Sequence, residues 1–392
     1  MAHVALMSVP LHGHVNPLLG VAAELVARGH RVTFATGADF APLIEEAGAV
    51  PVRYRTTFPG TDNRGRSWLP ADDDGRLAVD AFAKERDAAL PQVAAAYTAD
   101  VPDLVVYDTV TGHAPLLARA WGVPEVQFSP THAFPAGTRG PGVGGGPGAL
   151  SDTVPCIVAM PPSLQFEAEK TGPHHTYVGP VTWRRHAHGT WTPPPDGRPV
   201  ALVSLGTTYN TRTDLFRRAA EAVRALDGPD WHVVVATGHG TAPEALEGLP
   251  PGTEVHEWVP QVSVLARARL FITAGGTGSV LEGLTAGVPL VVLPQAIEQF
   301  LTARQVDTLG LGRALPPQDV TAQSLRSVVR EVTGDPGIGG RLARMRAEIA
   351  RCGGARAAAD VIEARLPTDG SRPPGAAPRT SAAPHGSKER LG

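Results

Sequence analysis

Short apolar runs alternate with helical patterns along the first half of the chain. Between the first two runs, apolar residues recur with the helical period at Leu18, Ala22 and Leu25, and Gly29 ends the pattern. Such β-α alternation predicts an open parallel sheet with helices on both faces. Buried strands are predicted at residues 3–9, 30–36, 50–54, 104–107, 125–128, 154–160 and 175–178, and helices at 18–26, 40–47, 77–97 and 114–121.

The same alternation starts again in the second half. Strands are predicted at 200–204, 231–236, 254–257, 270–273 and 288–293, and helices at 212–226, 280–286, 299–309, 321–333, 338–351 and 355–365. The fold class is therefore expected to be α/β, with two Rossmann-like domains that each contain a doubly wound parallel sheet.

Composition supports a two-domain organisation. At 392 residues the chain is too long for one ordinary core. The expected division is an N-terminal domain at 1–182, a proline-rich linker at 183–198 and a C-terminal domain at 199–366. Residues 367–392 lack core-forming side chains and are expected to be disordered.

Charge and cysteine content exclude several classes of protein. A net charge of −3 gives no electrostatic case for binding nucleic acid or an acidic membrane surface. Cys156 and Cys352 are too few for a disulfide framework, which favours a reducing, cytoplasmic setting. The first residues run directly into a predicted strand, so no signal peptide is expected, and no apolar run is long enough to cross a membrane.

One segment of the second half combines three features of a nucleotide site. A predicted strand at 270–273 is followed by a glycine-rich turn at 274–279 and then by a helix. Such a turn aims backbone N–H groups and the positive end of a helix at an anion. Trp258 supplies a flat apolar face, and the Glu282 carboxylate can accept two hydroxyl hydrogen bonds. A glycine-rich turn by itself is weak evidence, because many α/β proteins carry one without a ligand.

Two residues at predicted strand ends have the chemistry of a general base and its partner. His14 follows the first strand and Asp108 ends another, where open α/β sheets bind ligands. A neutral histidine can accept a hydroxyl proton while a carboxylate orients its ring. The spacing fits a His14 that packs a loop equally well. For Asp108, the spacing alone favours a helix N-cap over a partner of the base. His12 and His14 also fit a metal pair of a hydrolase, although the other histidines show no matching ligand spacing.

Several motifs in a fixed order resemble glycosyltransferase family 1, and most closely its bacterial macrolide glycosyltransferases. They are HGHVNPLL from His12, PDLVVYD ending at Asp108, VSLGTT from Val203, and the segment from Trp258-Val-Pro-Gln to Glu298-Gln299. The resemblance covers nearly the whole chain. It implies the GT-B fold, in which two Rossmann-like domains face a cleft, with the acceptor on the N-terminal side and the donor on the C-terminal side.

The resemblance also implies an inverting transfer of a hexose from a UDP- or dTDP-sugar, without a metal or other cofactor. His14 matches the general base and Asp108 its partner. The acceptor is expected to be an apolar macrolide, polyketide or phenolic compound. Its binding site is expected to be lined by Phe82, Phe128 and Phe134. The protein is expected to be a monomer or homodimer. For the donor, the resemblance implies that Trp258 and Gln261 bind the base, Glu282 the ribose, Thr207, Gly276, Thr277, Gly278 and Ser279 the diphosphate, and Glu298 and Gln299 the sugar.

The chain departs from the family pattern at two places. Ala274 stands where the family has a histidine that contacts the diphosphate, so an alternative hypothesis is a nucleotide-sugar-binding homologue with little or no turnover. Retention of His14 and Asp108 argues against that alternative. At 133–150 the chain has a glycine-rich stretch where macrolide relatives have longer helical segments, so acceptor identity does not carry over.

Overall fold

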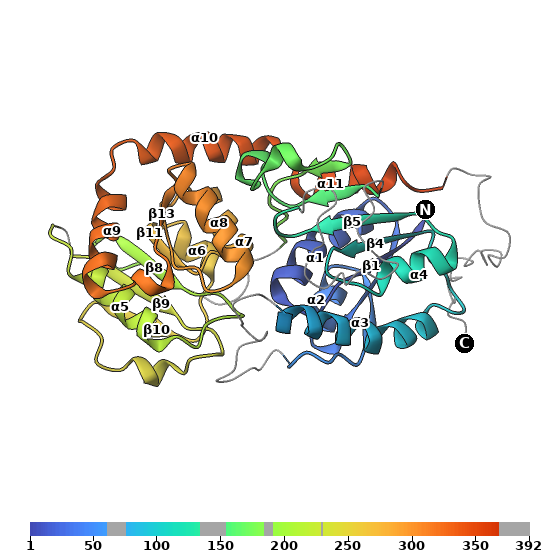
Figure 1. Cartoon of the computed structure of the whole chain (residues 1–392), viewed down its shortest axis with the longest axis horizontal. Coiled ribbons are helices and arrows are strands. Elements are labelled where there is room, and N and C mark those ends of the chain that lie inside the picture. Colours follow the sequence, from blue (N-terminus) through green and yellow to red (C-terminus); the bar gives the residue numbers. More distant parts are fainter. Residues whose placement is uncertain (61–75, 134–153, 184–190, 229, 368–392) are drawn as a thin grey trace, which may run out of the picture.

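Two parallel sheets form the centres of the two halves of the molecule (Figure 1). The computed structural model describes residues 1–60, 76–133, 154–183, 191–228 and 230–367. The first sheet has the strand order β3-β2-β1-β4-β5-β6-β7, and every neighbouring pair is parallel. Its strands are β1 (His3–Met7), β2 (Arg31–Gly37), β3 (Val50–Tyr54), β4 (Leu104–Asp108), β5 (Glu125–Ser129), β6 (Cys156–Val158) and β7 (His175–Tyr177).

The second sheet repeats this plan with the order β10-β9-β8-β11-β12-β13, again with parallel pairs. Strand order reverses between β1 and β4 in the first sheet and between β8 and β11 in the second, and ligands bind at such switch points in α/β proteins. The predicted fold class is therefore confirmed. The strands are β8 (Val200–Ser204), β9 (His232–Ala236), β10 (Thr253–His256), β11 (Ala268–Thr273), β12 (Leu290–Val292) and β13 (Gly312–Ala314).

Helices cover both faces of each sheet (Figure 1). The α-helices are α1 (His12–Ala27), α2 (Ala41–Glu46), α3 (Arg76–Ala96), α4 (Ala114–Trp121), α5 (Thr213–Arg224), α6 (Gln261–Leu265), α7 (Thr277–Ala286), α8 (Ile297–Thr308), α9 (Ala322–Gly334), α10 (Ile338–Arg351) and α11 (Gly354–Glu363). Short 3-10 helices occur at Ala38–Phe40, Pro162–Leu164, Ala168–Lys170, Pro243–Leu246 and Pro317–Asp319.

Alternation along β1 shows how the sheet separates two cores. Val4 and Leu6 pack with α1, while Ala5 and Met7 pack on the other face with residues of α3 and α4. All four side chains are fully buried. Both faces of a central parallel strand are therefore apolar, which is why the sequence shows a continuous apolar run there and not an alternating one.

The predicted strands and α-helices are present, and one short α-helix and one short strand were not predicted. Neither α6 nor β13 was predicted, because five helical residues give little periodicity and β13 is Gly-Arg-Ala. Most of the glycine-rich stretch, part of the linker and nearly all of the tail lie outside the described residues, so these predictions stay predictions. None of the described helices is long and apolar enough to cross a membrane.

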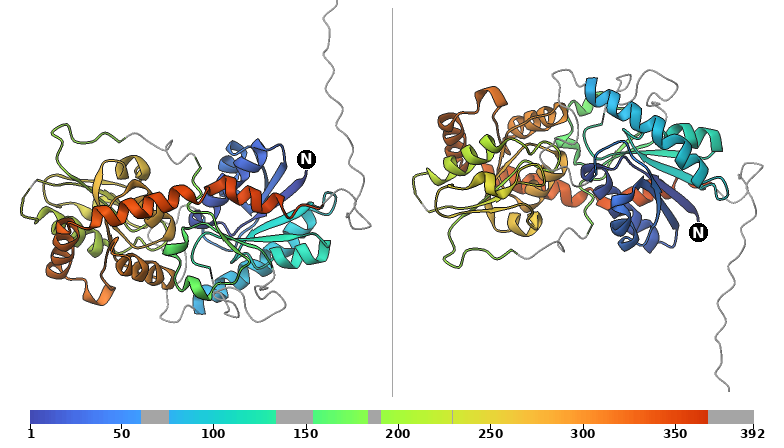
Figure 2. Two further views of the ribbon diagram at one scale, coloured as in Figure 1. Left: turned by 90° about the horizontal axis from the view of Figure 1, so that it is seen from above. Right: turned by 90° about the horizontal axis from the view of Figure 1, so that it is seen from below.

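The last helix does not pack with the domain to which the sequence analysis assigned it. The chain leaves α10 through Gly353 and Gly354, whose φ angles of 89° and 58° suit glycine, and α11 then lies against α1. Figure 2 shows the C-terminal helices, in red, running along both halves. Residues 199–366 are thus not one packing unit. An amphipathic pattern reveals that a helix is half-buried, but not which sheet it covers.

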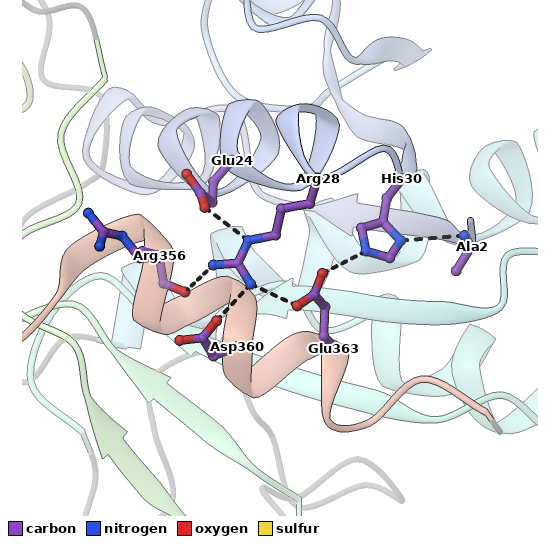
Figure 3. Close-up of polar contacts among 7 residues, drawn as sticks. All are labelled: Ala2, Glu24, Arg28, His30, Arg356, Asp360 and Glu363. Carbon is purple, nitrogen blue, oxygen red and sulfur yellow. Dashed lines mark hydrogen bonds and ion pairs between the residues drawn. The ribbon is translucent and has the colours of Figure 1, made fainter.

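A cluster of polar and charged side chains, from the end of α1 and the residues just after it to α11, holds α11 in place (Figure 3). Arg28 donates to Glu24 at 2.9 Å and, from one nitrogen, to both Asp360 and Glu363 at 2.7 Å. His30 lies 2.9 Å from the other oxygen of Glu363 and accepts from the backbone N–H of Ala2. Because one ring nitrogen accepts that N–H, the other carries the proton and donates to Glu363.

The attachment of α11 should depend on the ionisation of Glu363. Hydrogen bonds from His30 and Arg28 hold the pKa of Glu363 below its ordinary value of 4.5, against a smaller opposing effect of burial. A lowered carboxyl pKa contributes stability above 4.5 that is lost as the pH falls through the folded-state value. We expect Glu363→Gln to speed hydrogen exchange in α11 about two- to fivefold at pH 7, since partly exposed ion pairs are weak. Exchange measured by mass spectrometry checks this.

Glu331→Gln serves as the control, because Glu331 also binds an arginine, Arg313, but lies on α9. Its effect on α11 should be nil. Equal exchange of α11 in wild type and Glu363→Gln would contradict the assigned role of this cluster.

Candidate active site

A cavity of about 420 Å³ lies between the two halves. This volume is within the range of small-molecule sites. The N-terminal half contributes residues that follow β1 and β4, and the C-terminal half contributes residues that follow β8, β10, β11 and β12. Lining residues include Leu11, His12, His14, Phe82 and Val110 from one half, and Thr207, Trp258, Thr277, Glu282 and Gln299 from the other.

His14 and Asp108 meet at the switch point of the first sheet. β1 and β4 are neighbours in register, so α1, which follows β1, brings His14 next to the last residue of β4. Nδ1 of His14 lies 2.9 Å from Oδ2 of Asp108. Asp108 is fully buried behind His14, whose side chain is 14% exposed and lines the cavity. A carboxylate can only accept a hydrogen bond here, so the proton of the neutral ring lies on Nδ1 and Nε2 is left as the basic nitrogen.

Two negative charges raise the pKa of His14. Burial alone lowers it, but the charge and hydrogen bond of Asp108 and the charge of Glu298 raise the pKa above its ordinary value of 6.5. Glu298 lines the same cavity from the first turn of α8. Desolvation raises the pKa of Glu298 in turn, while His14 lowers it and Asp108 raises it. The cleft thus couples a histidine of one half to a carboxylate of the other.

The glycine-rich turn forms the N-terminus of α7. Gly275 has a φ of 88°, and a Cβ there would lie 2.6 Å from Val292, so the tight turn requires glycine. Gly276 and Gly278 face open space, where a Cβ would meet nothing within 4 Å. Thr277 is 4% exposed and its hydroxyl has no hydrogen-bond partner among the described residues. Free backbone N–H groups, a free hydroxyl and open space above the glycines suit a phosphate.

Next to this turn lie the residues predicted for a base and a ribose. Nε2 of Gln261 donates to Oε2 of Glu282 at 2.7 Å and to Oγ of Ser279 at 3.3 Å, which orients the Glu282 carboxylate. Trp258 is 48% exposed, so it is not a core aromatic residue. The centre of its ring lies 6.2 Å from that of His12 and 6.0 Å from that of His239, to which it is nearly parallel.

Gln299 has one end of its amide already occupied. Oε1 accepts the backbone N–H of Gln295 at 2.7 Å and of Ala296 at 3.2 Å, which caps the start of α8. The amide nitrogen, which can only donate, is therefore the end available to a ligand in the cavity.

The structure separates the three predicted acceptor residues. Phe82 lines the cavity, whereas Phe134 lies outside the described residues. Phe128 was wrongly assigned: it is fully buried in the core beneath α1. Because side chains alternate along a strand, Phe128 shares the core face of β5 with Val126. Ala274, 1% exposed, likewise packs in the core and does not line the cavity.

Sequence reasoning missed other residues of the cavity. Leu11, Val110, His132 and Tyr209 line it, and each follows the end of a parallel strand. That position is the one signal that could have found them. In the described part of the chain, no three His, Cys, Asp or Glu side chains are placed to hold a metal ion. His12 instead packs edge-on against Phe40, with ring centres 5.0 Å apart.

Known proteins resemble this chain over nearly its full length. The family model described as "Erythromycin biosynthesis protein CIII-like, C-terminal domain" matches residues 220–363. Oleandomycin glycosyltransferase of Streptomyces antibioticus is 37% identical over 93% of this chain and 91% of its own. NDP-glycosyltransferase YjiC of Bacillus licheniformis is 37% identical, over 93% of this chain and 98% of its own.

A solved structure shares the arrangement of both domains. The glycotransferase of kitacinnamycin superposes with a TM-score of 0.82 at 36% identity, covering 93% of this chain and 99% of its own. Identity at this level over both halves is evidence of common descent and not of a shared fold alone. The chain therefore belongs to the family 1 glycosyltransferases with the GT-B fold, among the bacterial enzymes of the macrolide type, and is a glycosyltransferase.

Proposed function

We propose that the protein moves a hexose from a UDP- or dTDP-sugar to a hydroxyl of an apolar small molecule, with inversion at the anomeric carbon and without a metal. One observation carries the proposal. His14, held by the buried Asp108, and the free N-terminus of α7 line the same cavity from opposite halves. A base for the acceptor and an anion site for the leaving group therefore face one reaction space.

On the acceptor side, Nε2 of His14 takes the proton of the attacking hydroxyl as the oxygen bonds to the anomeric carbon. Asp108 stabilises the imidazolium that forms and keeps the ring in the required tautomer. The bond to the nucleoside diphosphate breaks on the opposite face of the sugar. A single displacement of this kind inverts the configuration of the anomeric carbon.

On the donor side, each part of the nucleotide sugar has a partner of matching chemistry. Trp258 stacks on the uracil or thymine ring, beside Gln261, and Glu282 accepts from the ribose hydroxyls. Glu298 accepts from sugar hydroxyls, and the Gln299 amide nitrogen donates to them. Thr207, Gly276, Thr277, Gly278 and Ser279 hold the diphosphate, where donors stabilise the charge that grows as the bond breaks.

The acceptor side of the cavity supports an apolar substrate. Leu11, Phe82 and Val110 belong to one small hydrophobic cluster and also line the cavity. The relatives' association with oleandomycin and kitacinnamycin supports an acceptor of the natural-product type. We propose a macrolide, polyketide or phenolic compound as the acceptor class.

A nucleotide-sugar-binding homologue with little turnover is the second candidate function. Ala274 favours it, because the family's phosphate-contacting histidine is missing there. Since Ala274 is packed in the core, the diphosphate would depend on α7 and on the Thr277 hydroxyl. The two functions differ in one respect: the homologue binds UDP or dTDP but transfers no sugar.

The base assignment is tested by His14→Ala. We expect transfer to fall by about 10²- to 10⁴-fold, the usual contribution of a general base. Affinity for UDP or dTDP, measured by calorimetry, should stay within about twofold because the base contacts the acceptor side. His256→Ala is the matched control, since His256 lies on the edge strand β10, outside the cavity. Full transfer by His14→Ala would refute the assignment.

The pH dependence of transfer tests the two negative charges near His14. The base must be neutral, so kcat/KM should rise with pH and level off above the raised pKa of His14, which exceeds 6.5. Removing a negative charge lowers that pKa, because the imidazolium loses stabilisation. Asp108→Asn and Glu298→Gln should therefore both shift the midpoint of the profile to lower pH. A shift to higher pH in either variant would contradict this electrostatic account.

A further inference from the structure

His132 links the acceptor-side half to the helix that carries the sugar-binding residues. It follows β5, is 4% exposed and also lines the cavity. Nε2 of His132 lies 3.1 Å from Oγ1 of Thr302 on α8, in the other half. Nδ1 lies 3.1 Å from the backbone N–H of Phe166. The bond to Thr302 therefore crosses between the halves.

The direction of these hydrogen bonds is fixed by the neighbours of His132. The Phe166 N–H can only donate, so Nδ1 of His132 accepts and its proton lies on Nε2. Burial lowers the pKa of His132 to about 4, so the ring stays neutral at physiological pH. Nε2 thus donates to Oγ1 of Thr302, and Thr302 is fully buried. Every polar atom of the His132 ring has a partner, which fixes the orientation of the side chain.

The Thr302 side chain also makes a hydrogen bond to the first turn of α8. Its hydroxyl donates to the backbone carbonyl of Glu298 at 3.1 Å. Glu298 and Gln299 are the residues proposed to bind the donor sugar. The chain of hydrogen bonds from Phe166 through His132 and Thr302 therefore ends at the sugar-binding turn.

A second contact lies one turn further along α8. Nε2 of Gln305 donates to the backbone carbonyl of Gln165 at 2.9 Å. The Gln165 side chain accepts from Ala133 N–H and donates to Ala133 C=O, next to His132. Thr302 and Gln305 are three residues apart and so share one face of the helix. Two polar contacts thus join this face of α8 to the N-terminal half.

We infer that His132 is a positioning residue that holds the sugar-binding turn of α8 at a fixed place relative to His14. The inference rests on the proposed function. His14 lies on the N-terminal half and Glu298 and Gln299 on the C-terminal half, so their separation depends on contacts between the halves. Misplacement of a reacting group by about 1 Å can cost about 10²-fold in rate. The proposed nucleotide contacts, in contrast, lie at Trp258 after β10 and on α6 and α7, which the His132–Thr302 bond does not touch.

The inference is tested with full-length wild type, His132→Phe, Thr302→Val and the double variant. Each single variant should lower kcat by about 10- to 100-fold at saturating donor, while UDP and dTDP affinity stays within about twofold. The double variant should be no slower than the slower single variant, because both substitutions remove the same bond. Thr302→Ser, which keeps the hydroxyl, should keep near-normal kcat.

Thr333→Val is the matched control for Thr302→Val. Thr333 also donates to the carbonyl four residues earlier, Val329, but it lies on α9. The kcat of Thr333→Val should equal that of wild type. Hydrogen exchange at residues 298–302 gives a readout that needs no turnover, and it should be faster in His132→Phe and Thr302→Val than in wild type.

Two results would overturn the inference. The first is that His132→Phe keeps the kcat of wild type, or that weaker nucleotide binding accounts for its whole loss of activity. The other is a double variant whose loss is the product of the two single losses. If wild type itself transfers no sugar, the proposed function fails, and hydrogen exchange decides the role of His132 separately. Unchanged exchange at residues 298–302 in both variants would then reject it.

Discussion

The hydrogen bond between His14 and Asp108 is the contact on which the rest of the site depends. It forms because β1 and β4 are neighbours at the switch point, so that α1 brings His14 beside the last residue of β4. The α1 helix is held from outside by α11, whose charged contacts with Arg28 and His30 come from the far end of the chain. Residues at both ends of the sequence thus support the His14–Asp108 pair.

The site also requires that residues after the strands of one sheet face residues after the strands of the other across the cavity. Each sheet contributes one kind of chemistry: a histidine–carboxylate pair from the first, and a helix N-terminus with a free threonine hydroxyl from the second. Neither half alone could bring an acceptor oxygen to a donor sugar. The polar contacts of His132 and Gln305 matter for that reason, since they join the halves through α8, whose first turn lines the cavity.

The sequence predicted most of the fold because apolar periodicity reports burial, and it predicted residues at strand ends because parallel strands place them at one edge. It failed where a result depended on three-dimensional partners. Phe128 lies on a strand, but only the register shows that it faces the core. The α11 helix is amphipathic, but nothing local shows that it covers α1. The place of His132 after β5 could have put it at the cavity, but nothing local shows its contact with Thr302, 170 positions away.

The configuration of the product tests the central claim most directly. In the proposed reaction, His14 activates the acceptor hydroxyl for a single displacement from the face opposite the diphosphate. Proton NMR of the purified glycoside reports the anomeric configuration through the coupling of its anomeric proton. The account predicts inversion, so that an α-linked nucleotide glucose gives a β-glucoside. A product that retains the donor configuration would contradict it, because retention requires a second displacement or a different arrangement of attack.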